Sequence, residues 1–118
     1  MKNICIVLFL FLFYSCSSQD CDKLPESFNS YPEAIKLVKK SQFKITESAS
    51  TPNSSWIKSA KYYSCDGKQG CFIYTTNTNR EYIHYGLPMS VWIGFKNASS
   101  KGTYYNASIK NRYQLVLN

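Results

Sequence analysis

The chain opens with an apolar segment unlike anything that follows it. Lys2 is followed by an almost unbroken apolar run from Ile4 to Tyr14. The run is about 11 residues long, which suits the apolar region of a signal peptide and is too short for a helix that crosses a bilayer. We therefore expect residues 1–15 to be a signal peptide and the chain to be exported.

Apolar residues at helical spacing predict two helices. Ser30 can cap the first helix, and Glu33 can reach back to complete a capping box. Pro88 opens the second helix, which we expect to run to Ala98. The expected apolar faces consist of Tyr31, Ala34, Ile35 and Val38 in the first helix and of Val91, Trp92, Phe95 and Ala98 in the second. Trp92 and Phe95 should be buried against a sheet.

Alternating segments between these helices predict an antiparallel meander. Its three strands are expected at Trp56 to Tyr63, Cys71 to Thr76 and Arg80 to Tyr85, with turns between them. A short strand at residues 43–46 precedes the meander. A short helical turn with Ile109 and a last strand at residues 112–117 follow it.

The predicted fold class is therefore α+β. We expect a three-stranded antiparallel meander packed against a helix, with an N-terminal helix and a short C-terminal helical turn and strand. The expected organisation is a signal peptide over residues 1–15, a flexible tether over 16–29, the N-terminal helix and short strand over 30–53, and one domain over 54–118.

Ser15-Cys16 follows the apolar run directly. A small residue before a cysteine at this place resembles a lipobox, the signal read by bacterial lipoprotein-processing enzymes. The resemblance implies that the chain is cut before Cys16 and that acyl groups such as palmitate are attached there. The expected location is then the bacterial cell envelope, with the membrane as a partner, either in the periplasm or on the surface. An ordinary secretory peptide cut near Ser17 or Ser18, giving a secreted protein, is the alternative.

Cys21, Cys65 and Cys71 would remain to react in an oxidising compartment. Cys65 and Cys71 flank a turn-rich stretch between two predicted strands, so a hairpin would bring them face to face. We expect a disulfide between them, and a bridge from Cys21 to either one is the competing arrangement. Three cysteines and one histidine at these spacings match no common zinc site, so neither metal nor cofactor is expected.

The formal net charge of +7 shows a basic protein. Such a surface fits anionic lipid headgroups, nucleic acid or an acidic protein partner. The lysines are scattered, and the closest group is Lys36, Lys39, Lys40 and Lys44, which we interpret as the solvated end of the first helix.

Residues 54–113 carry a series of motifs in a recognisable order. The series consists of Ser54-Ser55-Trp56-Ile57, Tyr62-Tyr63, Glu81-Tyr82-Ile83-His84-Tyr85, Leu87-Pro88, Val91-Trp92, Phe95-Lys96, Ala98 to Asn106, Ile109 and Arg112-Tyr113. It resembles the KTSC domain, a module named for its occurrence at the C-terminus of some lysyl-tRNA synthetases. The resemblance implies a compact α+β module and no particular activity. Contact with nucleic acid is not expected of an envelope protein.

Tyrosines and the single histidine are the candidate functional residues. The candidate binding face consists of Tyr82, His84, Tyr104, Tyr105 and Arg112. Aromatic strands with interspersed cations can stack single-stranded bases or sugars, and the same tyrosines could instead fill the core of a small sheet. The acidic residues are dispersed and no phosphate loop is present.

We therefore predict a non-catalytic module that binds a protein partner, of the accessory or immunity type. The alternative is a small enzyme that uses Cys65 or His84, or a binder of single-stranded nucleic acid or sugar.

Overall fold

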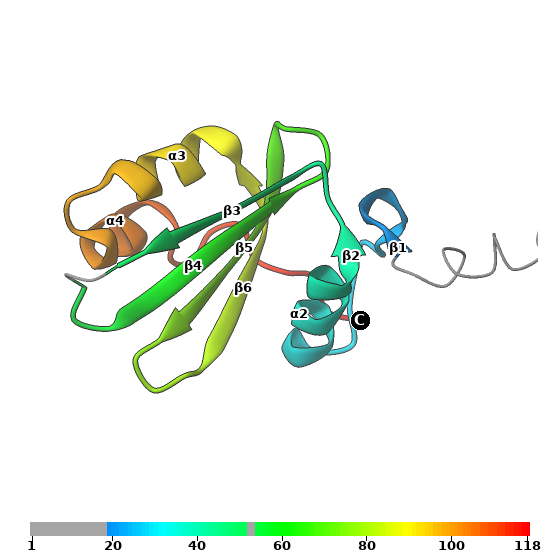
Figure 1. The fold of residues 1–118 in the computed structure, drawn as a ribbon. Helices are drawn as coiled ribbons and strands as arrows, with labels where there is room; N and C mark the ends of the chain where they lie inside the picture. The colour runs from blue at the N-terminus through cyan, green and yellow to red at the C-terminus, as the bar shows by residue number, and fades with distance from the viewer. Residues whose placement is uncertain (1–18, 52–53) are drawn as a thin grey trace, which may run out of the picture.

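The computed structural model describes residues 19–51 and 54–118 (Figure 1). The expected signal peptide and Cys16 lie outside the described residues. The α+β class is confirmed, with one antiparallel sheet in the order β3-β4-β5-β6. The strands are β3 (Ile45–Ser50), β4 (Ile57–Ser64), β5 (Gln69–Thr76) and β6 (Glu81–Pro88). The meander thus has four strands and not the predicted three, because residues 45–50 pair with residues 59–64 of β4.

Alternation along the central strands places apolar side chains on both faces of the sheet. One face carries Tyr62, Phe72, Tyr74 and Leu87, and the opposite face carries Tyr63, Cys71, Ile73 and Ile83. All of these residues are buried. A sheet whose two faces are both apolar must be covered on both sides, and the chain supplies one helical layer for each.

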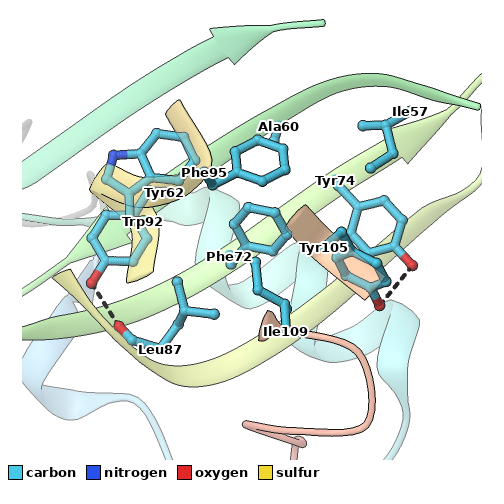
Figure 2. Packing of buried hydrophobic residues seen from close by; sticks show 10 residues of the cluster. All are labelled: Ile57, Ala60, Tyr62, Phe72, Tyr74, Leu87, Trp92, Phe95, Tyr105 and Ile109. Atoms are coloured by element: carbon cyan, nitrogen blue, oxygen red, sulfur yellow. Dashed lines mark hydrogen bonds between the residues drawn. The ribbon is translucent and has the colours of Figure 1, made fainter. Parts of the chain in front are cut away.

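Helices α3 (Met89–Asn97) and α4 (Lys101–Ser108) cover the first face (Figure 1). Trp92 and Phe95 are fully buried there, as predicted. The Trp92 ring stacks on Tyr62 with 5.2 Å between the ring centroids. The Tyr62 hydroxyl donates a 2.7 Å hydrogen bond to the carbonyl of Leu87, so burial leaves this polar group satisfied (Figure 2).

Helix α2 (Tyr31–Lys40) covers the second face and contributes Ala34, Ile35 and Val38 to its core. The predicted cap at Ser30 is present, whereas Glu33 reaches back to Asn29, one residue before the cap, and not to Ser30 itself. The Ser30 hydroxyl accepts from the backbone N–H of Glu33, and the Glu33 carboxylate accepts from the N–H of Asn29. Tyr31 was predicted on the buried face but is 45% exposed, because it lies at the first turn, beyond the edge of the core.

The segment before α2 is packed against the domain. Strand β1 (Gln19–Asp20) pairs in parallel with β2 (Ser41–Gln42), and the 3-10 helix η1 (Cys21–Lys23) follows it. Phe28 is 2% exposed, and its N–H donates to the carbonyl of Val116. The expected flexible tether over residues 16–29 is therefore wrong from Gln19 on, because a buried aromatic ring and backbone pairing fix this segment.

The C-terminal segment also differs from the prediction. The expected helical turn is the complete helix α4, and the expected strand at residues 112–117 is reduced to an isolated bridge between Phe28 and Leu117. Asn111 and Tyr113 adopt φ values of 65° and 52°. Residues in this left-handed region interrupt an extended strand, and the segment contributes Leu115 to the second core instead.

The disulfide joins Cys21 to Cys65, with 5.9 Å between their Cα atoms. The predicted bridge between Cys65 and Cys71 is wrong, and Cys71 is a buried free thiol. The register explains the difference. Cys71 lies opposite Tyr63 and points into the second core, whereas Cys65 lies past the end of β4 and is reached by η1.

We expect Cys65→Ser to lower the free energy of unfolding by about 4 kcal/mol, because the bridge closes a loop of 44 residues. A non-reduced digest should contain the peptide that joins Cys21 to Cys65, and Cys71 should react with iodoacetamide only after unfolding. Recovery of a peptide that joins Cys65 to Cys71 would contradict the observed pairing.

We expect Trp92→Ala to cost about 3–5 kcal/mol in a denaturant titration, through lost burial and the cavity left behind. The substitution also removes the 2.7 Å hydrogen bond from Trp92 Nε1 to the Glu47 carboxylate, which links α3 to β3. The neighbouring Ile93 is 44% exposed, so Ile93→Ala is the control and should stay within about 0.5 kcal/mol. Equal losses in the two variants would show that α3 does not pack through Trp92.

Candidate ligand-binding groove

A groove of about 850 Å³ lies beside β6, the last strand of the sheet. We call it the edge groove. Its floor is formed by Tyr74, Glu81, Tyr82, Ile83 and His84. One wall is α2, with Tyr31, Pro32, Ile35, Lys36 and Lys39, and the other wall is α4 and the following segment, with Tyr105, Lys110, Asn111, Gln114 and Leu115.

The two walls belong to the two helical layers on opposite faces of the sheet. Helix α2 packs on the second face through Ile35, whereas α4 packs on the first face through Tyr105. Residues of both layers line the groove beside β6, and no further strand of the described residues pairs with its outer edge. The groove therefore results from the fold as a whole.

A chain of hydrogen bonds crosses the floor from β5 to the far wall. The hydroxyls of Tyr74 and Tyr105 lie 3.1 Å apart, and the Tyr105 hydroxyl lies 2.8 Å from His84 Nε2 (Figure 2 draws the first of these bonds). His84 Nδ1 lies 3.0 Å from the carbonyl of Arg112. A carbonyl can only accept, so Nδ1 carries the proton and Nε2 accepts from Tyr105. Tyr105 in turn accepts from Tyr74.

Burial keeps this chain uncharged. Desolvation lowers the pKa of His84, partly opposed by its contacts with the backbone at Arg112 and Tyr113. Desolvation also raises the pKa values of Tyr74 and Tyr105. At neutral pH this hydrogen-bonded chain is thus polar and uncharged, with both imidazole nitrogens engaged.

Charge in the groove comes from its rim. Lys36, Lys39 and Lys110 line the groove with a single carboxylate, that of Glu81. Lys39 Nζ lies 2.5 Å from Glu81 Oε2, which joins α2 to β6 across the floor. Lys36 and Lys110 form no ion pair with any described residue, so the rim has an excess of positive charge.

The structure brings together three of the five predicted face residues. Tyr82, His84 and Tyr105 line the groove, and the Tyr82 ring is stacked on Tyr74 with 5.3 Å between centroids. Tyr104 lies elsewhere, since its hydroxyl donates to the carbonyl of Val91 on α3. Arg112 contributes its backbone carbonyl to His84, and its side chain is not part of the groove lining.

Sequence reasoning missed the wall formed by α2. It assigned Tyr31 to the core and interpreted Lys36 and Lys39 as a solvated helix end, whereas all three line the groove. No local pattern marks them, because the partner of Lys39 lies 42 residues away on β6.

The three cysteines that the structure describes offer no activated thiol. Cys65 is in the disulfide, and burial raises the pKa of Cys71 to about 12, so Cys71 stays protonated. Among residues 19–51 and 54–118, no group of three or more histidine, cysteine or acidic side chains is placed to hold a metal ion. None of the described helices is long and apolar enough to span a membrane.

We expect the protein to lose stability as the pH falls below 6.5. The pKa of His84 is lower than its ordinary value of 6.5, so the unfolded chain takes up this proton at a higher pH than the folded chain does. Stability is therefore full above pH 6.5 and decreases as the pH falls towards the folded-state pKa. Denaturant titrations between about pH 8 and 5 measure how the free energy of unfolding changes with pH. His84→Gln should lose less stability over this pH range, because it has no imidazole to protonate. The same pH dependence in His84→Gln and the wild type would contradict the role given to His84.

Comparison with protein families gives a match to the KTSC domain over residues 75–113, about a third of the chain. No curated protein and no solved structure matches the chain. The matched residues run from the end of β5 through β6, α3 and α4 to Tyr113, and so include most of the floor and part of one wall of the groove. They start later than the motif series noted at residues 54–113, and β3, β4 and α2 lie outside them. The resemblance of this chain to the KTSC domain is thereby confirmed for residues 75–113.

Proposed function

We propose that this protein is an exported, lipid-anchored and non-catalytic interaction module that binds a partner protein in the edge groove. The observation that carries the proposal is the groove itself, a concave site with exposed tyrosine rings and lysines on its rim. Tyr82 is 41% exposed and Tyr31 is 45% exposed. Tyrosine gives a large contact area at a small entropic cost and is enriched in protein interfaces.

The chemistry of the floor favours binding over catalysis. Both nitrogens of His84 are engaged with Tyr105 and Arg112, which leaves none directed at a substrate. The enzyme alternative also loses Cys65, whose thiol is consumed in the disulfide. A sugar or a base could stack on Tyr82, so these ligands are the second candidates and belong in the same experiment.

Lipid attachment would place this groove at the membrane surface. Cys16 precedes Gln19, the first described residue, by only three positions. Acyl chains contribute about 0.8 kcal/mol per buried CH₂, and a basic domain held this close adds attraction to anionic headgroups. The two effects together would keep the module on the envelope.

We expect Cys16 to be acylated in cells. Labelling with an alkyne fatty acid should mark the wild-type protein and leave Cys16→Ala unlabelled, because the thiol is the attachment point. Cys71→Ala is the matched control and should label like the wild type, since that thiol is buried. Equal labelling of Cys16→Ala and the wild type would show that the protein is not a lipoprotein of this kind.

We expect the groove to select peptides. The exported protein, purified in mild detergent, is used to enrich displayed random peptides of about nine residues, and chito-oligosaccharides and oligothymidylate are titrated in parallel. Tyr82→Ala should weaken binding of the enriched peptides at least about tenfold, by loss of aromatic contact. Ile93→Ala, on the outer side of α3, should bind as the wild type does.

The alternatives predict different results from the same titrations. Binding of the saccharide or the oligonucleotide alone, again lost in Tyr82→Ala, would replace the protein-binding proposal with the second candidate. Peptides that bind the wild type and Tyr82→Ala equally would remove the groove from the proposal.

A further inference from the structure

The hydrogen-bond phase of β6 shows which of its backbone groups face the groove. At the hairpin, the N–H of Thr76 donates to the carbonyl of Arg80 at 2.9 Å. In an antiparallel pair, hydrogen-bonded and non-bonded positions alternate. Tyr82 and His84 therefore direct their N–H and C=O groups towards β5, opposite Tyr74 and Phe72. Glu81 and Ile83 direct theirs away from the sheet.

A second hydrogen bond confirms this phase from the other side. The N–H of Tyr85 donates to the carbonyl of Tyr113 at 2.9 Å, so this odd-numbered position also faces outward. In the described part of the chain, the segment around Tyr113 thus forms one backbone hydrogen bond with the edge of β6. Among the described residues, no hydrogen bond from another segment reaches the backbone of Glu81 or Ile83. Both residues line the groove, Glu81 as an exposed residue and Ile83 as a buried one with 4% of its surface exposed.

We propose that an extended acidic segment of a partner protein adds to β6 as a fifth strand and occupies the edge groove. This inference rests on the proposed function and specifies how the partner binds. The added strand would take up the outward N–H and C=O groups of Glu81 and Ile83, which lie in a row along the groove. Addition of a strand to a free sheet edge beside a helix is a recurring mode of peptide recognition.

The two walls suit the side chains of such a strand. A neighbouring strand lies about 4.8 Å from β6, and its successive side chains point to opposite faces of the sheet. One set would contact α2 at Ile35 and Lys36, and the other would contact Tyr82 and Lys110 on the opposite side. Each set meets an apolar or aromatic surface with a lysine at its border.

Charge selects the occupant. Lys39 is already paired with Glu81, whereas Lys36 on one wall and Lys110 on the other have no acidic partner among the described residues. The floor adds no positive charge, since His84 is held neutral by burial, and its one carboxylate, Glu81, is the partner of Lys39. An added strand with Asp or Glu on both of its faces would neutralise both lysines.

The experiment uses the peptides enriched on the exported wild-type protein, synthesised individually. Each peptide is prepared in three forms: unmodified, with N-methyl groups at the odd-numbered residues, and with N-methyl groups at the even-numbered residues. Strand addition requires the N–H groups of one phase only, so one N-methylated series should lose binding at least about tenfold while the other keeps it. The enriched sequences should be rich in Asp and Glu, and Lys36→Glu combined with Lys110→Glu should abolish their binding.

A matched pair of variants tests the edge of β6 itself. Glu81→Ala and Glu81→Pro both lose the carboxylate that pairs with Lys39, but only proline removes the outward N–H. Proline is tolerated at the first residue of an edge strand, and circular dichroism checks that both variants are folded. Glu81→Pro should bind the peptides at least about fivefold more weakly than Glu81→Ala.

The results separate this inference from the proposed function. Peptides that bind through Tyr82 but tolerate both N-methylated series would overturn strand addition. Peptides without an excess of Asp and Glu would overturn the acidic occupant. Either result would leave the interaction module in place. Absence of any enriched peptide that depends on Tyr82 would overturn both. Loss of binding in one phase, together with the difference between the two Glu81 variants, would establish strand addition.

Discussion

Burial of β5 on both faces is the constraint on which the rest of this structure depends. Phe72 and Tyr74 point to one side of this central strand, and Cys71 and Ile73 point to the other. Phe72 contacts the rings of Trp92, Phe95 and Tyr105, so it holds α3 and α4 in place (Figure 2). A sheet that is apolar on both faces cannot be left open to water on either. The N-terminal segment and α2 are therefore structural parts of the domain.

The second helical layer has a consequence at the border of the sheet. Residues of α2 line the groove on one side of β6 and Tyr105 of α4 lines it on the other, while no further strand among the described residues pairs with the outer edge of β6. The sheet edge becomes the floor of a groove. Natural proteins usually protect such an edge with charge or by covering it. Here Lys39 and Glu81 cross part of it, the Tyr113 carbonyl takes one N–H, and no described backbone group bonds to the outward N–H and C=O of the buried Ile83.

The polar chain through Tyr74, Tyr105 and His84 connects the sheet to α4 and to the segment that follows it. Each side chain donates a hydrogen bond to the next group in the chain, and none is charged at neutral pH. The chain can therefore be buried beside an aromatic core. Because the chain fixes the position of Tyr105 and of the backbone at Arg112, it also fixes one wall of the groove. The shape of the site and the stability of the core thus depend on the same side chains.

The sequence by itself determined the elements whose signals are local. These are the helix cap at Ser30, the start of a helix at Pro88, the alternation of the strands and the placement of Trp92 and Phe95 in the core, which all follow from neighbouring residues. The resemblance to the KTSC domain came from an ordered series of such local motifs. The placement of Tyr82 and His84 on the same face of their strand followed from the alternation of side chains between the two faces.

Tertiary structure alone decided what depends on residues far apart in the chain. The pairing of Cys21 with Cys65 required η1 to meet the end of β4, and spacing along the chain does not encode that meeting. The pairing of β3 with β4, the burial of Phe28 and the use of Lys36 and Lys39 as a wall likewise depend on how α2 docks against β6. Hydrophobic patterns specify which face of an element is buried, but they do not specify its partner, because burial is non-directional.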